Sequence, residues 1–372
     1  MAESDASSAV VLSPAERTLP TKVQGLKRRD YAIIPALIVL SALLTGCLSE
    51  ILARTLWPAR MDDPCFLSDA TAGPHHRANC SVSFKGPETS PVTLRFNDCG
   101  YRSVHSCKAP LAPGTVRIVL LGSSDVMGYY TRYEQTFGSE LETEIRSYTG
   151  TAVEVQNMAC DFFTPGDAVK RLREIIDLHP SLVVYPLTRN DVQHSGPPQW
   201  VRVPWTTRLI ARSRAVLMGQ HFLYGDDRVY LRQFLANRQA SGFLRTPLPK
   251  RWKNYLVDAD VSLGRLTDGL HASGIQLLLA ALPQQAETAL LSSNEIPPGL
   301  DPHQFARLIG EIAKRRRASY IDIDPKFTKK AGTGEFYYRV NAHLKPEAHR
   351  EVTAVLAPKI VKLVLASHRE RS

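Results

Sequence analysis

The sequence predicts an α/β fold, a three-layer sandwich with a mainly parallel five-stranded sheet. Two observations predict it: short, continuously apolar runs that read as buried strands, and helical spacing of apolar residues between them. Apolar strands that alternate with helices form a parallel sheet covered on both faces. The strands are expected at Arg117–Gly122, Ala152–Asn157, Leu182–Leu187, Ile275–Leu282 and Ser319–Ile323.

The helices of this sandwich follow from the apolar spacing between the strands. We expect helices over about 134–148 and 166–178, one ahead of each of the last two strands, and a final amphipathic helix over about 346–366. Ligands of such sheets bind at the carboxyl ends of the strands. The residues that follow each strand are therefore the candidates for function.

The composition agrees with a folded protein. The chain has 372 residues, of which 44% are hydrophobic and 22% charged, which excludes a disordered chain, a collagen-like repeat and a small disulfide scaffold. The length allows one large domain with additions or two modest domains. A net charge of +10 indicates anionic surroundings such as nucleic acid, lipid head groups or acidic polysaccharide.

A long apolar run near the N-terminus predicts a transmembrane helix. The uncharged stretch Tyr31–Ser49 follows Lys27–Arg29 and ends at Glu50, and about 20 apolar residues suffice to cross a bilayer. The basic flank places the N-terminal side in the cytoplasm. We expect a single-pass inner-membrane anchor with the rest of the chain periplasmic. The alternative is a lipoprotein, because Leu44–Cys47 resembles a lipobox whose cysteine would carry the lipid.

Four cysteines gather in one short stretch after this run. An even set in an extracytoplasmic protein indicates disulfides, and of three connectivities we expect Cys65–Cys80 and Cys99–Cys107. A zinc site is the alternative, although the spacings lack the tight pairs that zinc prefers. Short alternating runs make this segment a small β-rich stalk, with the neighbouring His75–His76 in a solvated loop.

The chain therefore divides into four parts with one insertion. The insertion is rich in arginine and lysine with interleaved aromatic residues. It is either a solvated helical insertion with an aromatic underside or a lid or patch that contacts anionic lipid or polysaccharide; an anchored external domain does not meet nucleic acid. The expected parts are a cytoplasmic tail (1–30), the anchor (31–49), a cysteine-containing segment (50–113), and a catalytic-type domain (114–372) that carries the insertion (194–254).

Polar residues follow the predicted strands in a consistent order. Gly122-Ser123-Ser124 follows the first strand, and a serine at a tight strand-to-helix turn presents its hydroxyl at the sheet edge beside backbone amides. The other stretches are Asn157–Cys160, Thr188–Asp191 and Asn341–His349. Each alone is a weak signal, whereas four in order favour one site at the sheet edge.

From about Val116 onward, these stretches resemble the SGNH (GDSL-type) serine hydrolase superfamily, in its membrane-anchored bacterial form. Gly122–Gly128 is similar to G-D-S-x-x-x-G, Asn190-Asp191 to N-D, and the run HLKPEAH from His343 to H-L-N-P-x-G-H. Upstream, Asn97–Arg102 resembles the phrase N-x-x-G-[FY]-R that precedes the domain. The resemblance implies a flavodoxin-like sandwich that hydrolyses or transfers acyl esters.

The resemblance also implies a role for each matching residue. Ser124 is the expected nucleophile and His343 its base, since a serine hydroxyl attacks only when a base takes its proton. The oxyanion hole is expected from the amides of Ser124 and Ala159 and the side chain of Asn190. Asp191 and Gly122 complete the expected site. Ser123 is the alternative nucleophile, Cys160 a packed apolar residue and His349 a structural one.

Three departures from the family pattern matter. Ser123 replaces the first Asp, Ala159 replaces a glycine donor, and the aspartate that should support His343 is missing, with Val340 and Asn341 in its place. Asn341 can donate or accept a hydrogen bond but supplies no charge, and in a serine protease the exchange of Asp for Asn lowers turnover by about four orders of magnitude. A backbone carbonyl, or another acid such as Asp322 or Asp324, could support the ring instead.

These observations predict a membrane-anchored serine esterase that removes or transfers acyl groups. The resemblance and the expected compartment together imply O-acetyl groups of an envelope or secreted polysaccharide as the substrate. The chemistry requires neither a metal nor an organic cofactor. Two alternatives remain open: a catalytically impaired domain that binds or helps to assemble polysaccharide, and a lipase-like hydrolase whose basic insertion contacts lipid.

Overall fold

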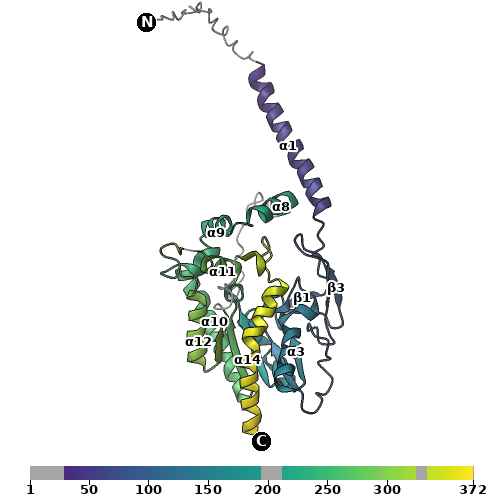
Figure 1. Ribbon diagram of the computed structural model, residues 1–372, viewed down its shortest axis with the longest axis vertical. Helices are drawn as coiled ribbons and strands as arrows, with labels where there is room; N and C mark the ends of the chain where they lie inside the picture. Colours follow the sequence, from purple (N-terminus) through teal and green to yellow (C-terminus); the bar gives the residue numbers. More distant parts are fainter. Residues whose placement is uncertain (1–28, 194–211, 294, 324–332, 372) are drawn as a thin grey trace, which may run out of the picture. The chain divides into compact units, whose positions relative to one another are not determined.

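The computed structural model describes residues 29–193, 212–293, 295–323 and 333–371 (Figure 1). Internal contacts divide the chain into two units, Met1–Ser49 and Glu50–Ser372. Helix α1 (Asp30–Leu56) begins in the first unit and ends in the second. It is longer than the predicted span because the residues after Cys47 continue the helical pattern. Its segment Tyr31–Leu56 is apolar and long enough to cross a membrane by length and composition.

The second unit is built on the predicted parallel five-stranded sheet, which confirms the fold class. Its strands lie in the order β6-β5-β7-β8-β9, and every neighbouring pair is parallel. The bounds are β5 (Val116–Leu120), β6 (Val153–Asn157), β7 (Leu182–Leu187), β8 (Gln276–Ala281) and β9 (Ser319–Asp322). All five lie within a residue or two of the ranges that the apolar runs predict.

Helices cover both faces of this sheet and make it a three-layer sandwich. Ile118 and Leu120 of β5 pack in one core with α3 (Phe137–Thr149) and α14 (Pro346–Arg371), whereas Val119 faces a second core. That second core holds α4 (Pro165–Lys170), α5 (Leu172–Asp177), α10 (Lys250–Ala272) and α12 (Gln304–Arg316). Successive side chains of a strand point to opposite faces, so continuously apolar strands fit a sheet buried on both sides.

The cysteine-containing segment forms two small antiparallel sheets. They are β1 (Phe66–Asp69) with β2 (Gly73–His76), and β3 (Ser81–Phe84) with β4 (Val92–Arg95). The disulfides Cys65–Cys80 and Cys99–Cys107 form as predicted. Phe84 and Leu94 share the apolar core of α3 and α14, so this segment packs directly against the sandwich. The prediction that His75–His76 is a solvated loop is wrong, because His76 is buried on β2.

The basic insertion is helical in its described part. It contains α8 (Arg214–Leu223), α9 (Asp227–Ala236), a 3-10 turn (Ala240–Leu244) and the start of α10. Tyr230, Phe243 and Trp252 are buried in the core, while Arg228 and Phe222 are exposed, so only part of the aromatic set lies on a buried face. Residues 194–211, with Trp200, Arg202, Trp205 and Arg208, lie outside the described residues.

Short helices occupy the connections at the carboxyl edge of the sheet. They follow β5, β7 and β8, and a 3-10 turn precedes the histidine loop. Their bounds are α2 (Ser124–Met127), α6 (Arg189–Gln193), α11 (Gln285–Leu291) and Thr333–Glu335; a further 3-10 turn, Tyr133–Gln135, leads into α3.

Candidate active site

The turn after β5 presents Ser124 at the sheet edge. Gly122 has φ 148°, and a Cβ there would lie 2.3 Å from Cγ2 of Val126, so only glycine fits this close approach. The carbonyl of Gly122 accepts a hydrogen bond from the amide of Cys160 at 3.0 Å, which ties the turns after β5 and β6 together. Ser123 is buried, whereas Ser124 is only half-buried and begins α2.

Ser124 and His343 form a hydrogen-bonded pair. Nε2 of His343 lies 2.9 Å from Oγ of Ser124, and Nδ1 lies 3.2 Å from the backbone carbonyl oxygen of Asn341. Because a carbonyl can only accept, Nδ1 carries the ring proton in this contact. The lone pair of Nε2 then faces the serine hydroxyl, which is the arrangement that a general base requires.

Asn341 supports the histidine through its backbone rather than its side chain. Oδ1 of Asn341 accepts the amide of His343 at 3.0 Å, an Asx turn that shapes the loop. Of the supports that the sequence left open, the structure therefore shows the backbone carbonyl. Asp322 is exposed at the end of β9, where its charge acts on Glu287, and Asp324 lies outside the described residues.

Two carboxyl groups that sequence reasoning missed lie close to the pair. Burial raises the pKa of Asp125, while the charge of His343 and the amide of Leu344, 3.3 Å from Oδ1, act in the opposite direction. Burial also raises the pKa of Asp161, and the Ser124 hydroxyl is within hydrogen-bond reach of this carboxyl. Only their positions in the sequence, directly after Ser124 and Cys160, could have suggested these acids.

The expected oxyanion hole is only partly open. The amide of Ser124 is the first in α2 and therefore has no acceptor within that helix. Asn190 is half-buried on α6, after β7. The amide of Ala159, in contrast, donates to Oδ1 of Asn157 at 3.1 Å. To use the amide of Ala159, an oxyanion would have to displace the Asn157 side chain.

Asp191 stabilises the turn after β7. Its carboxylate accepts the amide of Thr188 at 2.9 Å and the hydroxyl of the same residue at 3.1 Å. Burial raises the pKa of Asp191 to about 7, an effect that a hydrogen bond from the Ser123 hydroxyl opposes. The buried Ser123 hydroxyl is thus directed at Asp191, whereas the hydroxyl that contacts His343 is that of Ser124.

Cys160 has a histidine beside it, contrary to what the sequence pattern indicates. Nδ1 of His76 lies 3.4 Å from Sγ of Cys160, and Nε2 of His76 lies 3.4 Å from Oδ2 of Asp63. Cys160 is nevertheless only 1% exposed, and burial raises the pKa of its thiol. The thiolate is the reactive form of cysteine, so a buried thiol with a raised pKa is poorly suited to attack a substrate. Cys160 instead packs against His76 of the cysteine-containing segment.

The segment Asn97–Arg102 holds the nucleophile turn through hydrogen bonds to its backbone. The buried guanidinium of Arg102 donates to the carbonyl of Met127 at 2.6 Å and also to the carbonyls of Gly128 and Thr131. Asn97 shapes the preceding turn, since Oδ1 accepts the amide of Tyr101 at 2.9 Å. The rings of two tyrosines lie beside the histidine: those of Tyr129 and Tyr130 are centred 5.8 and 5.0 Å from the ring of His343.

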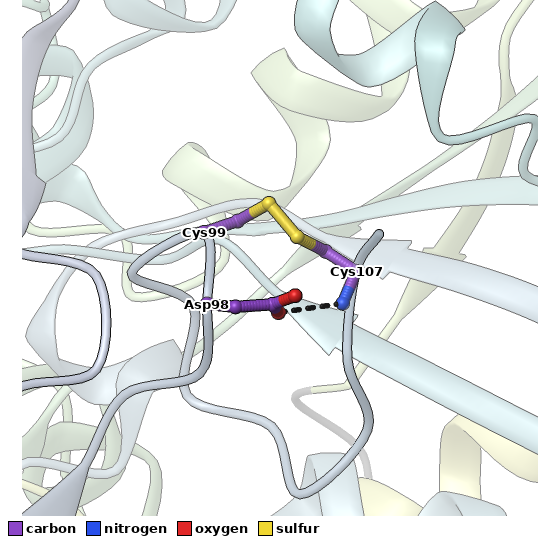
Figure 2. A group of neighbouring side chains, drawn as sticks. All are labelled: Asp98, Cys99 and Cys107. Carbon is purple, nitrogen blue, oxygen red and sulfur yellow. Dashed lines mark hydrogen bonds between the residues drawn. A yellow bond between two sulfur atoms is a disulfide. The ribbon is translucent and has the colours of Figure 1, made fainter. Parts of the chain in front are cut away.

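One group of the described residues has its ligand atoms close enough to hold a metal ion. Asp98, Cys99 and Cys107 have these atoms within 4.8 Å of one another. Figure 2 shows, however, that the two sulfurs are joined in the disulfide and that Asp98 accepts the amide of Cys107, at 2.9 Å. These contacts close a loop of the chain. Because disulfide sulfurs are not the thiolates that bind metals, the group does not fit a metal site.

Fold and site together define an α/β sandwich with a serine–histidine pair at the carboxyl edge of its sheet. No family model and no curated protein matches the chain. Matching solved structures include TesA (13% identity, 66% of this chain and 99% of that chain, TM-score 0.42). A mutant of Axe2, an acetylxylan esterase from Geobacillus stearothermophilus, matches at 15% identity (67% and 94%, TM-score 0.41).

A GDSL-like lipase from Bacteroides thetaiotaomicron also matches, at 13% identity over 66% of this chain and 87% of that chain, with a TM-score of 0.36. Similarity at this level does not assign an activity. The function of the chain therefore has to be inferred from the site itself.

Proposed function

We propose that the chain is a serine esterase of the SGNH type that hydrolyses or transfers acyl groups. The observation that carries the proposal is the contact between Ser124 and His343, with Nδ1 of the histidine on the Asn341 carbonyl. A hydroxyl, a base with a fixed tautomer and a half-exposed position at a sheet edge are what nucleophilic acyl transfer requires.

The proposed reaction has two halves. In the first, Ser124 loses its proton to Nε2 of His343 and its oxygen attacks the ester carbonyl; the alcohol leaves with that proton and an acyl-enzyme remains. In the second, His343 takes a proton from water or from an acceptor hydroxyl, whose oxygen attacks the acyl carbonyl. The bond to Oγ breaks, the acid or the new ester leaves, and Nε2 returns the proton to Ser124.

The developing oxyanion would be stabilised by the amide of Ser124 and the side chain of Asn190. Removal of one such donor typically lowers turnover by about 10²–10³-fold. The amide of Ala159 would join only after release from Asn157. A hole that is incomplete at rest favours a second candidate function, a domain that binds acylated polysaccharide with little turnover.

We also propose that the protein is anchored by α1, with its catalytic domain outside the cytoplasm. The apolar span Tyr31–Leu56 and the two disulfides support this location; a cleaved leader, including one processed before Cys47, would lead to the same compartment. An acylated carbohydrate is the proposed substrate. The exposed ring of Phe162, next to Asp161, offers an apolar surface for a sugar.

The test uses the full chain in detergent, with 4-nitrophenyl acetate as substrate and a fluorophosphonate as a covalent probe. Ser124→Ala should abolish both turnover and labelling, whereas Cys160→Ser should keep the label. Turnover or labelling that persists in Ser124→Ala would exclude this serine as the nucleophile. An unlabelled wild-type protein that still binds acetylated polysaccharide would favour the second candidate.

A further inference from the structure

A carboxylate from the cysteine-containing segment reaches the loop that carries His343. Glu88 lies in the turn between β3 and β4, and its side chain is only 2% exposed. Oε2 of Glu88 accepts the backbone amides of Val340 at 2.9 Å and Asn341 at 3.2 Å. These are the two positions at which the family pattern would place the aspartate that supports the histidine.

The contact bears directly on the catalytic pair. The residue whose amide donates to Glu88 is also the residue whose carbonyl accepts Nδ1 of His343, at 3.2 Å. A carboxylate that holds the amide of Asn341 fixes this residue, and with it the direction of its carbonyl. The carboxylate therefore reaches the histidine loop through its backbone amides.

Other contacts hold Glu88 in this place. Oε1 lies 2.7 Å from Nδ1 of His221 on α8, and the guanidinium of Arg339 donates to the carbonyl of His221 at 3.4 Å. The turn also packs on the aromatic side of the site, because a Cβ at Gly86 would lie 2.8 Å from the ring of Tyr130. Three segments of the chain therefore meet at one buried carboxylate.

We propose that Glu88 is a positioning residue for the Ser124–His343 pair, supplying through the backbone of 340–341 the carboxylate that the histidine loop itself lacks. This inference rests on the proposed esterase function. Glu88 does not contact substrate; it acts through Asn341.

The experiment compares Glu88→Gln with wild type in the full chain. Glutamine keeps the size of the side chain and one oxygen acceptor but removes the charge, so the protein should still fold. We expect kcat for 4-nitrophenyl acetate and the rate of fluorophosphonate labelling to fall about 10–100-fold, by analogy with the outer-shell partners of metal-bound histidines, with KM unchanged.

Glu142→Gln is the matched control. Glu142 is likewise a mostly buried carboxylate that accepts a backbone amide, that of Val155 at 2.7 Å, and pairs with a histidine, His105 at 3.1 Å. It lies on α3 rather than behind the histidine loop, so Glu142→Gln should keep the wild-type kcat.

A rescue variant separates positioning from folding. Asn341→Asp, added to Glu88→Gln, returns a negative charge to the loop and should recover part of the lost kcat. A wild-type kcat in Glu88→Gln would overturn the role of Glu88 and leave the esterase proposal intact. A loss of kcat in Glu88→Gln that Asn341→Asp does not repair, together with a lower Tm, would also overturn the inference. A wild-type protein that the probe does not label would overturn the esterase proposal and, with it, this role.

Discussion

Oγ of Ser124 and Nε2 of His343 are 2.9 Å apart although 219 residues separate them in the sequence. The fold brings them together because the turn after β5 and the loop before α14 both end at the carboxyl edge of the sheet. The backbone carbonyl of Asn341 then sets the tautomer of the ring. In this site the histidine ring is thus supported by the backbone of its own loop.

The first prediction concerns the side chain of Asn341. Asn341→Ala removes the Asx turn to the His343 amide but leaves the carbonyl that holds Nδ1. We expect kcat/KM to fall about tenfold or less, the equivalent of one hydrogen bond. His343→Ala should lower it by several orders of magnitude because the base itself is lost. Equal losses in the two variants would show that the Asn341 side chain, not its carbonyl, supports the ring.

The second prediction concerns the nucleophile turn. Gly122→Ala places a methyl group 2.3 Å from Cγ2 of Val126 at a φ of 148°, so the turn must shift and carry Ser124 with it. A misplacement of about 1 Å can lower a rate about 100-fold, and we expect a loss of that size in kcat together with a lower Tm.

Gly114→Ala is the control for this turn. Gly114 also has a positive φ, 75°, but a Cβ there would meet nothing within 4 Å. It should lower the free energy of unfolding by about 1 kcal/mol from backbone strain and leave kcat unchanged. Normal kcat in Gly122→Ala would mean that the turn tolerates a side chain and does not fix the nucleophile.

The third prediction tests Arg102, which supports the same turn. Arg102→Met removes the donors to the carbonyls of Met127, Gly128 and Thr131 and leaves them buried without those partners. Each such loss destabilises by about 1–3 kcal/mol, so we expect a Tm at least several degrees lower and a reduced kcat. Arg95→Met, on the exposed face of β4, should change neither. A wild-type Tm in Arg102→Met would show that these carbonyls find other donors.

The sheet and the Ser124–His343 pair could be predicted because their signals are local in the sequence. Leu182–Leu187 is a strand with the predicted bounds. The signal is a short run without charged residues, and the structure buries all six of them, as expected for a strand covered on both faces. Ser124 and His343 lie in short motifs at the ends of such elements, and parallel strands bring their carboxyl ends to one edge.

The supporting residues could not be predicted, because their roles come from tertiary contacts that leave no pattern. Glu88, His76 and Asp161 are single polar residues in turns or on short strands, where no periodicity marks them. The carbonyl of Asn341 is invisible in a sequence, since every residue has one. The engaged amide of Ala159 depends likewise on the rotamer of Asn157.

The last prediction concerns stability against acid. His349 is fully buried under the nucleophile turn, and the amide of Phe137 donates to its Nδ1 at 3.4 Å. Burial, together with the charge of Arg102, lowers the pKa of His349 to about 3 from the ordinary 6.5. The folded state therefore holds the ring neutral, and the unfolded chain takes up the proton first as the pH falls.

The sign of the effect follows from this difference. The contribution of His349 to stability is fully present above pH 6.5 and is lost as the pH falls from 6.5 towards 3. The slope approaches about 1.4 kcal/mol per pH unit well inside this range. Asp191 and Glu140, whose pKa values burial raises to about 7, act in the opposite direction, so the total curve of the wild type does not isolate the histidine.

A comparison with His349→Gln does isolate it, because Asp191 and Glu140 titrate in both proteins. We expect the free energy of unfolding in urea, measured at pH 7, 6, 5 and 4, to fall more steeply for wild type than for His349→Gln. The gap between the proteins should narrow as the pH falls. His271→Gln, on an exposed turn of α10, should parallel wild type. Parallel curves for His349→Gln as well would show that the ring at 349 is free to take up a proton in the folded state.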